Sequence, residues 1–107
     1  MSASTAVSED QVWEALHAVI DPELGVDFVD LGLVYEIELE EGERGTRVHI
    51  VFSLTSPGCG IGPQVATQME EVVEALDGVE RAFPRMVFTP AWTPERMSED
   101  AKFALGY

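Results

Sequence analysis

Apolar residues near the start of the chain recur at helical spacing, as seen for Val12, Leu16 and Val19. Ser8 precedes them and has the side chain of an N-cap residue, with Gln11 three positions on as its capping-box partner. Pro22 disfavours helical geometry for the residue before it. We therefore predict a helix over residues 9–20.

A second helical stripe follows Pro63, a residue that suits the first position of a helix. Gln and Glu residues alternate around it, and Gly78 can end the helix in a left-handed conformation. The stripe predicts a second amphipathic helix whose core-facing residues are Val65, Ala66, Met69, Val72, Val73 and Leu76.

Strict alternation of apolar and polar residues between these helices predicts two antiparallel strands joined by a hairpin at residues 41–45. Val34 and Ser53 fall on the solvent face in this pattern. The core-facing positions are Leu33, Tyr35, Ile37 and Leu39 in the first strand and Val48, Ile50, Phe52 and Leu54 in the second. Residues 79–88 form a weaker strand that Pro84 confines to an edge or a bulge, and its pairing stays open.

These elements predict an α+β fold built as a two-layer sandwich, with a small, mostly antiparallel sheet covered on one face by two helices. Helix starts at Thr93 and Ser98 add short C-terminal helices. We expect residues 1–7 to form a disordered N-terminus and residues 8–107 to form a single domain.

Charge and cysteine content narrow the class of protein. The 107 residues carry 20 acidic and 6 basic side chains, a formal charge of -14, so phosphates and anionic lipids are repelled and we expect neither nucleic-acid nor membrane binding. The single Cys59 excludes an internal disulfide. With an N-terminus unlike a secretion signal, it predicts a cytoplasmic protein.

Cys59 lies in a glycine-rich loop four residues before Pro63. Free N–H groups and the helix dipole stabilise a thiolate there, so we expect a lowered pKa for this thiol and a role as nucleophile or metal ligand. The alternative is a small buried apolar residue.

Two carboxylates, Asp21 and Glu23, flank a rigid proline turn after the first helix and are either metal ligands or groups that hold the turn. Asp27 and Asp30 can cap the same loop. His17 and His49 fall on polar faces and are expected to be solvated. No histidine is positioned to activate Cys59, and a closed zinc site needs more Cys or His ligands than one thiol provides.

Three motifs in register resemble the SufT-like and PaaD-like family of metal-sulfur cluster assembly factors. They are DPELGVDFVDLGLVYEIE, TSPGC and TPAWTPERMSEDAKFALGY, with 31 residues between the DPE motif at 21–23 and Thr55. The resemblance implies a compact α+β domain that matures or delivers iron-sulfur clusters through a reactive Cys59. It also implies that Asp21, Glu23 and Thr55 are accompanying motif positions.

The chain departs from the family pattern at Gly60, where proline is common, and it carries no Cys-rich segment like that of PaaD-type proteins, so a SufT-like factor fits better. We predict an adaptor or transient carrier, not an enzyme. Alternatives are a PaaD-like maturation or interaction module for a specific metabolic oxygenase, and a thiol-dependent enzyme using Cys59.

The cargo would be a transient iron-sulfur cluster or iron, with no tightly bound cofactor. One thiol leaves iron coordination incomplete, so we expect a homodimer, a partner protein or a small thiol to complete it. The partners would be iron-sulfur scaffold or carrier proteins and apo-target proteins.

Overall fold

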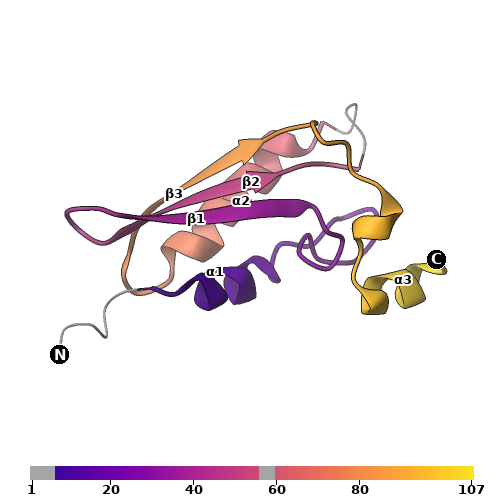
Figure 1. Cartoon of the computed structure of the whole chain (residues 1–107), viewed down its shortest axis with the longest axis horizontal. Coiled ribbons are helices and arrows are strands. Elements are labelled where there is room, and N and C mark those ends of the chain that lie inside the picture. The colour runs from indigo at the N-terminus through magenta and orange to yellow at the C-terminus, as the bar shows by residue number, and fades with distance from the viewer. Residues whose placement is uncertain (1–6, 56–59) are drawn as a thin grey trace.

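Seven elements follow one another in the computed structural model, which describes residues 7–55 and 60–107 (Figure 1). They are α1 (Glu9–Leu16), β1 (Val34–Glu41), β2 (Thr46–Phe52), α2 (Gly62–Glu74), β3 (Val79–Met86), the 3-10 helix η2 (Pro94–Arg96) and α3 (Glu99–Leu105).

The sheet has the strand order β1-β2-β3. A hairpin pairs β1 and β2 antiparallel, as expected, whereas β3 pairs parallel to β2 and is reached through α2. Pro84 therefore lies on an edge strand, where its missing N–H costs no ladder hydrogen bond. The α+β class is confirmed, and the pairing that the sequence left open is parallel.

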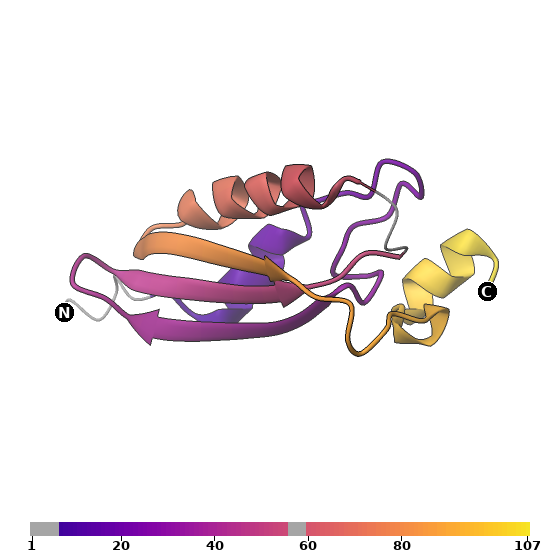
Figure 2. The same cartoon turned by 90° about the horizontal axis from the view of Figure 1, so that it is seen from above.

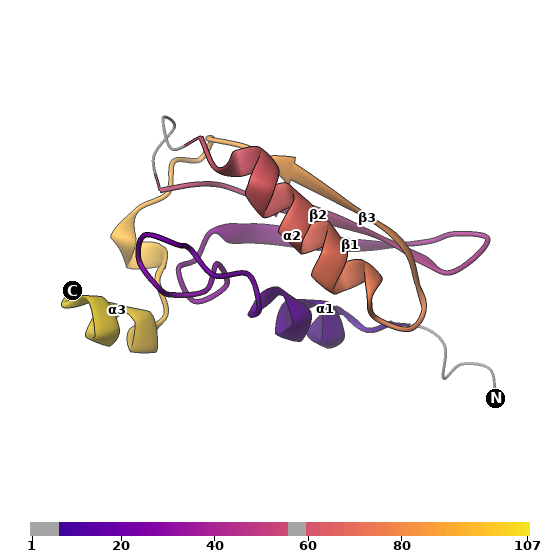
Figure 3. The same ribbon diagram turned by 180° about the vertical axis from the view of Figure 1, so that it is seen from behind.

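α1 and α2 lie on one face of the sheet and form the second layer. α2 lies behind the strands in Figure 1 and in front of them in the opposite view of Figure 3. Val65, Met69 and Val73 of the predicted stripe are buried, and its other members pack partly buried against the core. Val7, assigned to the disordered N-terminus, is only 6% exposed and belongs to this core.

The first helix is shorter than the predicted range 9–20 and ends at Leu16. The capping box of Ser8 and Gln11 is present, so the start is confirmed. At the other end the N–H groups of residues 17–19 bond three residues back, which tightens the last turn. Ile20 then forms an isolated antiparallel bridge with Asp27, and this pairing requires extended backbone.

Two positions predicted to face solvent are buried. A bulge between Val34 and Glu36 shifts the alternation of β1, so Val34 is 7% exposed. Tyr35, expected to face the core, is half-buried instead and donates its hydroxyl to the Pro90 carbonyl at 2.9 Å. Ser53 is 1% exposed, and its N–H bonds to the Leu33 carbonyl beyond the end of β2.

The C-terminal segment packs at the end of the sheet opposite the hairpin (Figure 2). Ser98 caps α3, and Gly106 ends it in a left-handed conformation. Gly32 (φ +74°) lies so close to the Arg96 backbone that a Cβ there would overlap the Arg96 carbonyl oxygen. Only glycine fits at this crossing.

Candidate functional site

The DPE motif forms a tight turn between α1 and the loop that precedes β1. Asp21 is 2% exposed, and its Oδ1 accepts hydrogen bonds from the N–H groups of Glu23 at 2.8 Å and Leu24 at 3.1 Å. Its own N–H donates to the Val26 carbonyl, and its carbonyl accepts from the Gly25 N–H. Asp21 therefore holds the turn, whereas the Glu23 side chain is exposed.

This turn lies beside the N-terminal end of α2. Ile20 and Pro22 line a small hollow of about 50 Å³ whose other wall is Ile61, Gln64, Val65 and Gln68. Ile61 at the N-cap makes no side-chain capping bond, so no side chain of the described residues caps the first N–H groups of this helix there. The positive end of the α2 dipole thus lies close to the DPE turn.

Gly62, the first residue of α2, is buried against Met86 of β3. A Cβ at this position would lie 2.6 Å from the Met86 sulfur, so a larger residue would require the Met86 side chain to move. This contact places the start of α2 against β3.

Thr55 is half-buried at the last described position before the loop. Cys59, the predicted ligand or nucleophile, belongs to residues 56–59 and lies outside the described part of the chain. The structure thus brings the DPE turn to the helix entrance that follows Cys59, and the role of the thiol stays a prediction.

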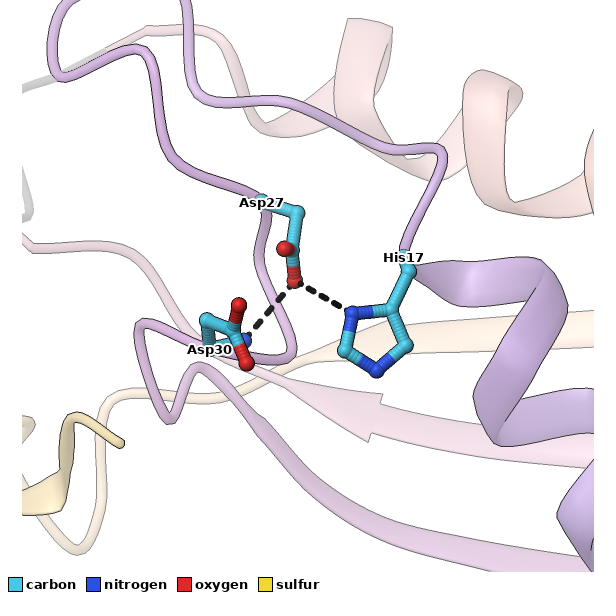
Figure 4. A group of neighbouring side chains, drawn as sticks. All are labelled: His17, Asp27 and Asp30. Carbon is cyan, nitrogen blue, oxygen red and sulfur yellow. Dashed lines mark hydrogen bonds and ion pairs between the residues drawn. The ribbon is translucent and has the colours of Figure 1, made fainter. Parts of the chain in front are cut away.

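His17, Asp27 and Asp30 form a cluster that the sequence analysis did not predict (Figure 4). The Nδ1 atom of His17 lies 3.1 Å from Asp27 Oδ1, which also accepts the Asp30 N–H at 2.8 Å. The His17 side chain is 41% exposed, as expected for a solvated histidine, but its contact with Asp27 was not part of that expectation. The expected capping role of Asp27 is confirmed.

The cluster offers one nitrogen and two carboxylate oxygens within 4.8 Å of one another, a donor set that divalent ions accept. Among the residues at 7–55 and 60–107, neither Asp21 nor Glu23 belongs to such a group. The cluster also has a structural explanation without a metal ion. Asp27 contacts His17 and accepts the Asp30 N–H, and these contacts hold the loop after α1 closed. The bridge between Ile20 and Asp27 turns the chain back, and this brings Asp27 close to His17. The hydrophobic pattern of the sequence does not predict this bridge.

Asp30 has a pKa raised above its ordinary value. Burial is the largest cause, and the neighbouring negative charge and hydrogen bond of Asp27 act in the same direction. His17 and Ser98 oppose the shift. Two adjacent carboxylates therefore resist carrying full charge together.

His49 is also engaged. Its Nε2 lies 2.9 Å from Glu40 Oε1 and its ring stacks on Phe83, so the expectation of a merely solvated histidine was incomplete. It lies on the sheet face that the helices do not cover, away from the DPE turn.

The fold and the site define a class of protein. Its members are compact α+β domains with a buried DPE turn beside the entrance of α2. Residues 9–82 match the family described as iron-sulfur cluster assembly protein, and the chain belongs to this family. The resemblance of the three sequence motifs is thereby confirmed. No helix in the described ranges is long and apolar enough to cross a membrane.

Relatives of similar length share the whole domain. The chain is 39% identical over 98 residues to the Fe-S protein maturation auxiliary factor YitW of Bacillus subtilis, covering 92% of this chain and 93% of that protein. It is 41% identical over 88 residues to the auxiliary factor SufT of Staphylococcus aureus, with coverage of 82% and 97%. A solved DUF59 domain from Bacillus anthracis superposes with a TM-score of 0.82 at 39% identity, covering 92% and 91% of the two chains.

Proposed function

We propose that this protein is an auxiliary factor in the maturation of iron-sulfur proteins, acting as an adaptor or transient carrier through Cys59. The observation that carries the proposal is the family match together with relatives of nearly equal length that are named as such factors. An auxiliary role without catalysis agrees with those names.

The geometry around the loop supports a role for Cys59. Cys59 stands two residues before Ile61 in the sequence, and the α2 entrance at Ile61 lies beside the DPE turn. A thiolate close to the N-terminus of a helix is stabilised by the helix dipole. Glu23 is the exposed carboxylate of the motif, so it is free to approach an iron ion, whereas one oxygen of Asp21 is already engaged with the backbone.

Iron or an iron-sulfur cluster is the cargo in this proposal and is not tightly held. A cluster normally takes four protein ligands, mostly thiolates, and this chain has one cysteine. The remaining ligands come from a second subunit, a partner protein or a small thiol. Scaffold or carrier proteins would deliver the cargo and apo-target proteins would accept it, in the cytoplasm.

The test compares wild type with Cys59→Ser in cells that lack the gene. The activity and iron content of an iron-sulfur enzyme should recover with wild type and fail to recover with Cys59→Ser at equal protein level. Thr67→Ser, on the exposed side of α2, is a matched control that should behave as wild type. Full function of Cys59→Ser would contradict a role for the thiol and leave an interaction module.

Anaerobic reconstitution with iron and sulfide separates the adaptor from the carrier. A carrier should gain visible absorption and bound iron in the wild type only, and a low-molecular-weight thiol or a second copy should increase the yield. If neither variant binds iron while the cellular test still depends on Cys59, the protein is an adaptor. Turnover of a thiol-reactive substrate would instead support the enzyme alternative.

A further inference from the structure

Within residues 7–55 and 60–107, no helix lies over one face of the sheet. Figure 1 views this face with α2 behind the strands. Every second residue along each strand projects from it, opposite to the buried positions. These residues are Glu36, Glu38 and Glu40 of β1, Arg47, His49 and Val51 of β2, and Arg81, Phe83 and Arg85 of β3. We call this set the open face.

Charge on the open face is divided by strand. The register aligns Glu36, Val51 and Arg85 in one row across the sheet. The β1 side is therefore acidic and the β3 side is basic, with β2 between them. The basic side is unusual in a chain of formal charge -14 that has only six Lys and Arg residues.

The middle of the open face is partly apolar. The His49 ring stacks on Phe83 with 5.2 Å between centroids and 18° between planes. Phe83 is 38% exposed, and the Arg81 guanidinium lies 5.5 Å from its ring centre. A hollow of about 500 Å³ lies over His49 and Phe83 and reaches Val51. This centre can bury apolar area against a partner.

Several charges of the open face lack a partner within the part of the chain that the structure describes. Glu40 is paired with His49, and Arg47 with Glu80. Glu36 and Arg85 take part in no ion pair among the described residues and are exposed. They are available for contacts with another molecule.

We propose that the open face binds the open face of a second copy of this chain, related by a two-fold axis parallel to the strands. Rotation about that axis lays β1 of one copy over β3 of its partner. Each acidic stripe then meets a basic stripe, with Glu36 opposite the partner's Arg85 and Val51 opposite the partner's Val51. The inference is independent of the proposed function.

The other face-to-face symmetry is disfavoured by the same charges. A two-fold axis across the strands would lay β1 over β1 and place glutamates against glutamates. A self-complementary patch is what an isologous interface requires, and only the axis along the strands provides it. Sheets packed in this way lie about 10 Å apart, within reach of Glu and Arg side chains.

The size of the open face predicts a weak dimer. Three strands about 4.8 Å apart and seven residues at about 3.3 Å cover roughly 300 Å², less than half of the ~800 Å² that each partner buries in a standard interface. The net negative charge of both copies also opposes association. At about 0.15 M salt this repulsion is screened beyond ~8 Å, whereas contacting pairs still attract.

Sedimentation velocity of the full chain over a concentration series up to about 1 mM tests the proposal at this ionic strength. Wild type should associate. Glu36→Arg and Arg85→Glu should each weaken self-association by about tenfold or more, because each places like charges opposite one another twice in the dimer. An equimolar mixture of the two variants should associate as wild type does, because both contacts become Glu–Arg pairs again.

Matched controls separate the face from net charge and from misfolding. Glu71→Arg on the exposed side of α2 changes the charge as Glu36→Arg does, and Lys102→Glu matches Arg85→Glu. Both controls should associate like wild type, and circular dichroism should show that all variants are folded. A wild type that stays monomeric, or a mixture that fails to associate, overturns the proposal.

Discussion

The indole N–H of Trp92 donates a 2.6 Å hydrogen bond to the carbonyl of Leu31, 61 residues earlier in the chain. Leu31 is fully buried in the loop between α1 and β1, and Trp92 packs half-buried against the core. The Ser98 N–H bonds to the Asp30 carbonyl at 2.7 Å in the same region. The C-terminal segment is therefore tied to the loop that carries the DPE turn.

Replacing Trp92 by Phe should weaken this tie. The change keeps an aromatic ring but leaves the Leu31 carbonyl without its donor, so the free energy of unfolding should fall by about 1–3 kcal/mol. Urea denaturation followed by circular dichroism measures it. Trp13→Phe is the control, because its indole bonds to the exposed Glu9 carboxylate and its loss should cost clearly less. Equal losses for both variants would contradict a structural role for the Trp92 bond.

Substitutions of Asp21 and Glu23 should have different effects when stability and function are measured on the same variants. Asp21→Asn keeps an oxygen acceptor for the two N–H groups, whereas Asp21→Ala leaves them unpaired in a buried turn and should cost about 1–3 kcal/mol. Glu23→Gln should leave the unfolding midpoint unchanged, since its side chain is exposed.

The cellular maturation assay then identifies the ligand. If Glu23 approaches the cargo, Glu23→Gln loses function at unchanged stability. Asp21→Asn should retain both. Loss of function in Asp21→Asn with intact stability would show that the Asp21 charge itself is needed.

Met69 should be a major contributor to the stability of the domain. Its side chain is fully buried between α2 and the sheet, so Met69→Ala should lower the free energy of unfolding by about 2–5 kcal/mol. Glu71→Ala, two positions along on the exposed side, should change it by less than about 0.5 kcal/mol. An unchanged midpoint for Met69→Ala would mean that the core collapses around the gap.

The cluster around His17 predicts a pH dependence of stability. The pKa of Asp30 is raised from its ordinary 3.8, so the folded state binds this proton more tightly than the unfolded state does. Ionised Asp30 therefore opposes folding above its folded pKa, and this effect vanishes as the pH falls below 3.8. Asp30→Asn should be relatively more stabilising at pH 7 than at pH 3.

Thermal unfolding of wild type and Asp30→Asn across that range checks the sign. Asp77→Asn, an exposed position after α2, is the control and should show a smaller change with pH. A difference between Asp30→Asn and wild type that is constant with pH would contradict the proposed effect of the Asp27 charge and of burial.

Sequence periodicity correctly predicted those helices and strands that contact the core through a single face. The α2 stripe around Met69 and the alternation of β2 are examples. Periodicity failed at the ends of helices and strands, where contacts with other parts of the chain determine the backbone conformation. The bulge beside Val34 and the bridge at Ile20 depend on residues that are distant in the pattern.

The site could be predicted only in part for the same reason. The Asp-Pro-Glu spacing indicated a turn. The sequence alone does not show whether a carboxylate in this motif accepts backbone N–H groups or binds a metal ion. Burial of Asp21 and exposure of Glu23 distinguish the two. The contact of His17 with Asp27 could not be read from the helix pattern, because it arises only after α1 ends and the chain turns back.

The parallel pairing of β3 with β2 makes the two ends of the molecule unequal. The loop before β1, the chain after β2 and the segment after β3 all adjoin one end of the sheet, and the hairpin of residues 42–45 lies at the other (Figure 2). The molecule is 47 Å long. A dye or surface linker attached at the exposed Glu43 would therefore tether every copy in the same orientation, with the DPE turn accessible to proteins in solution.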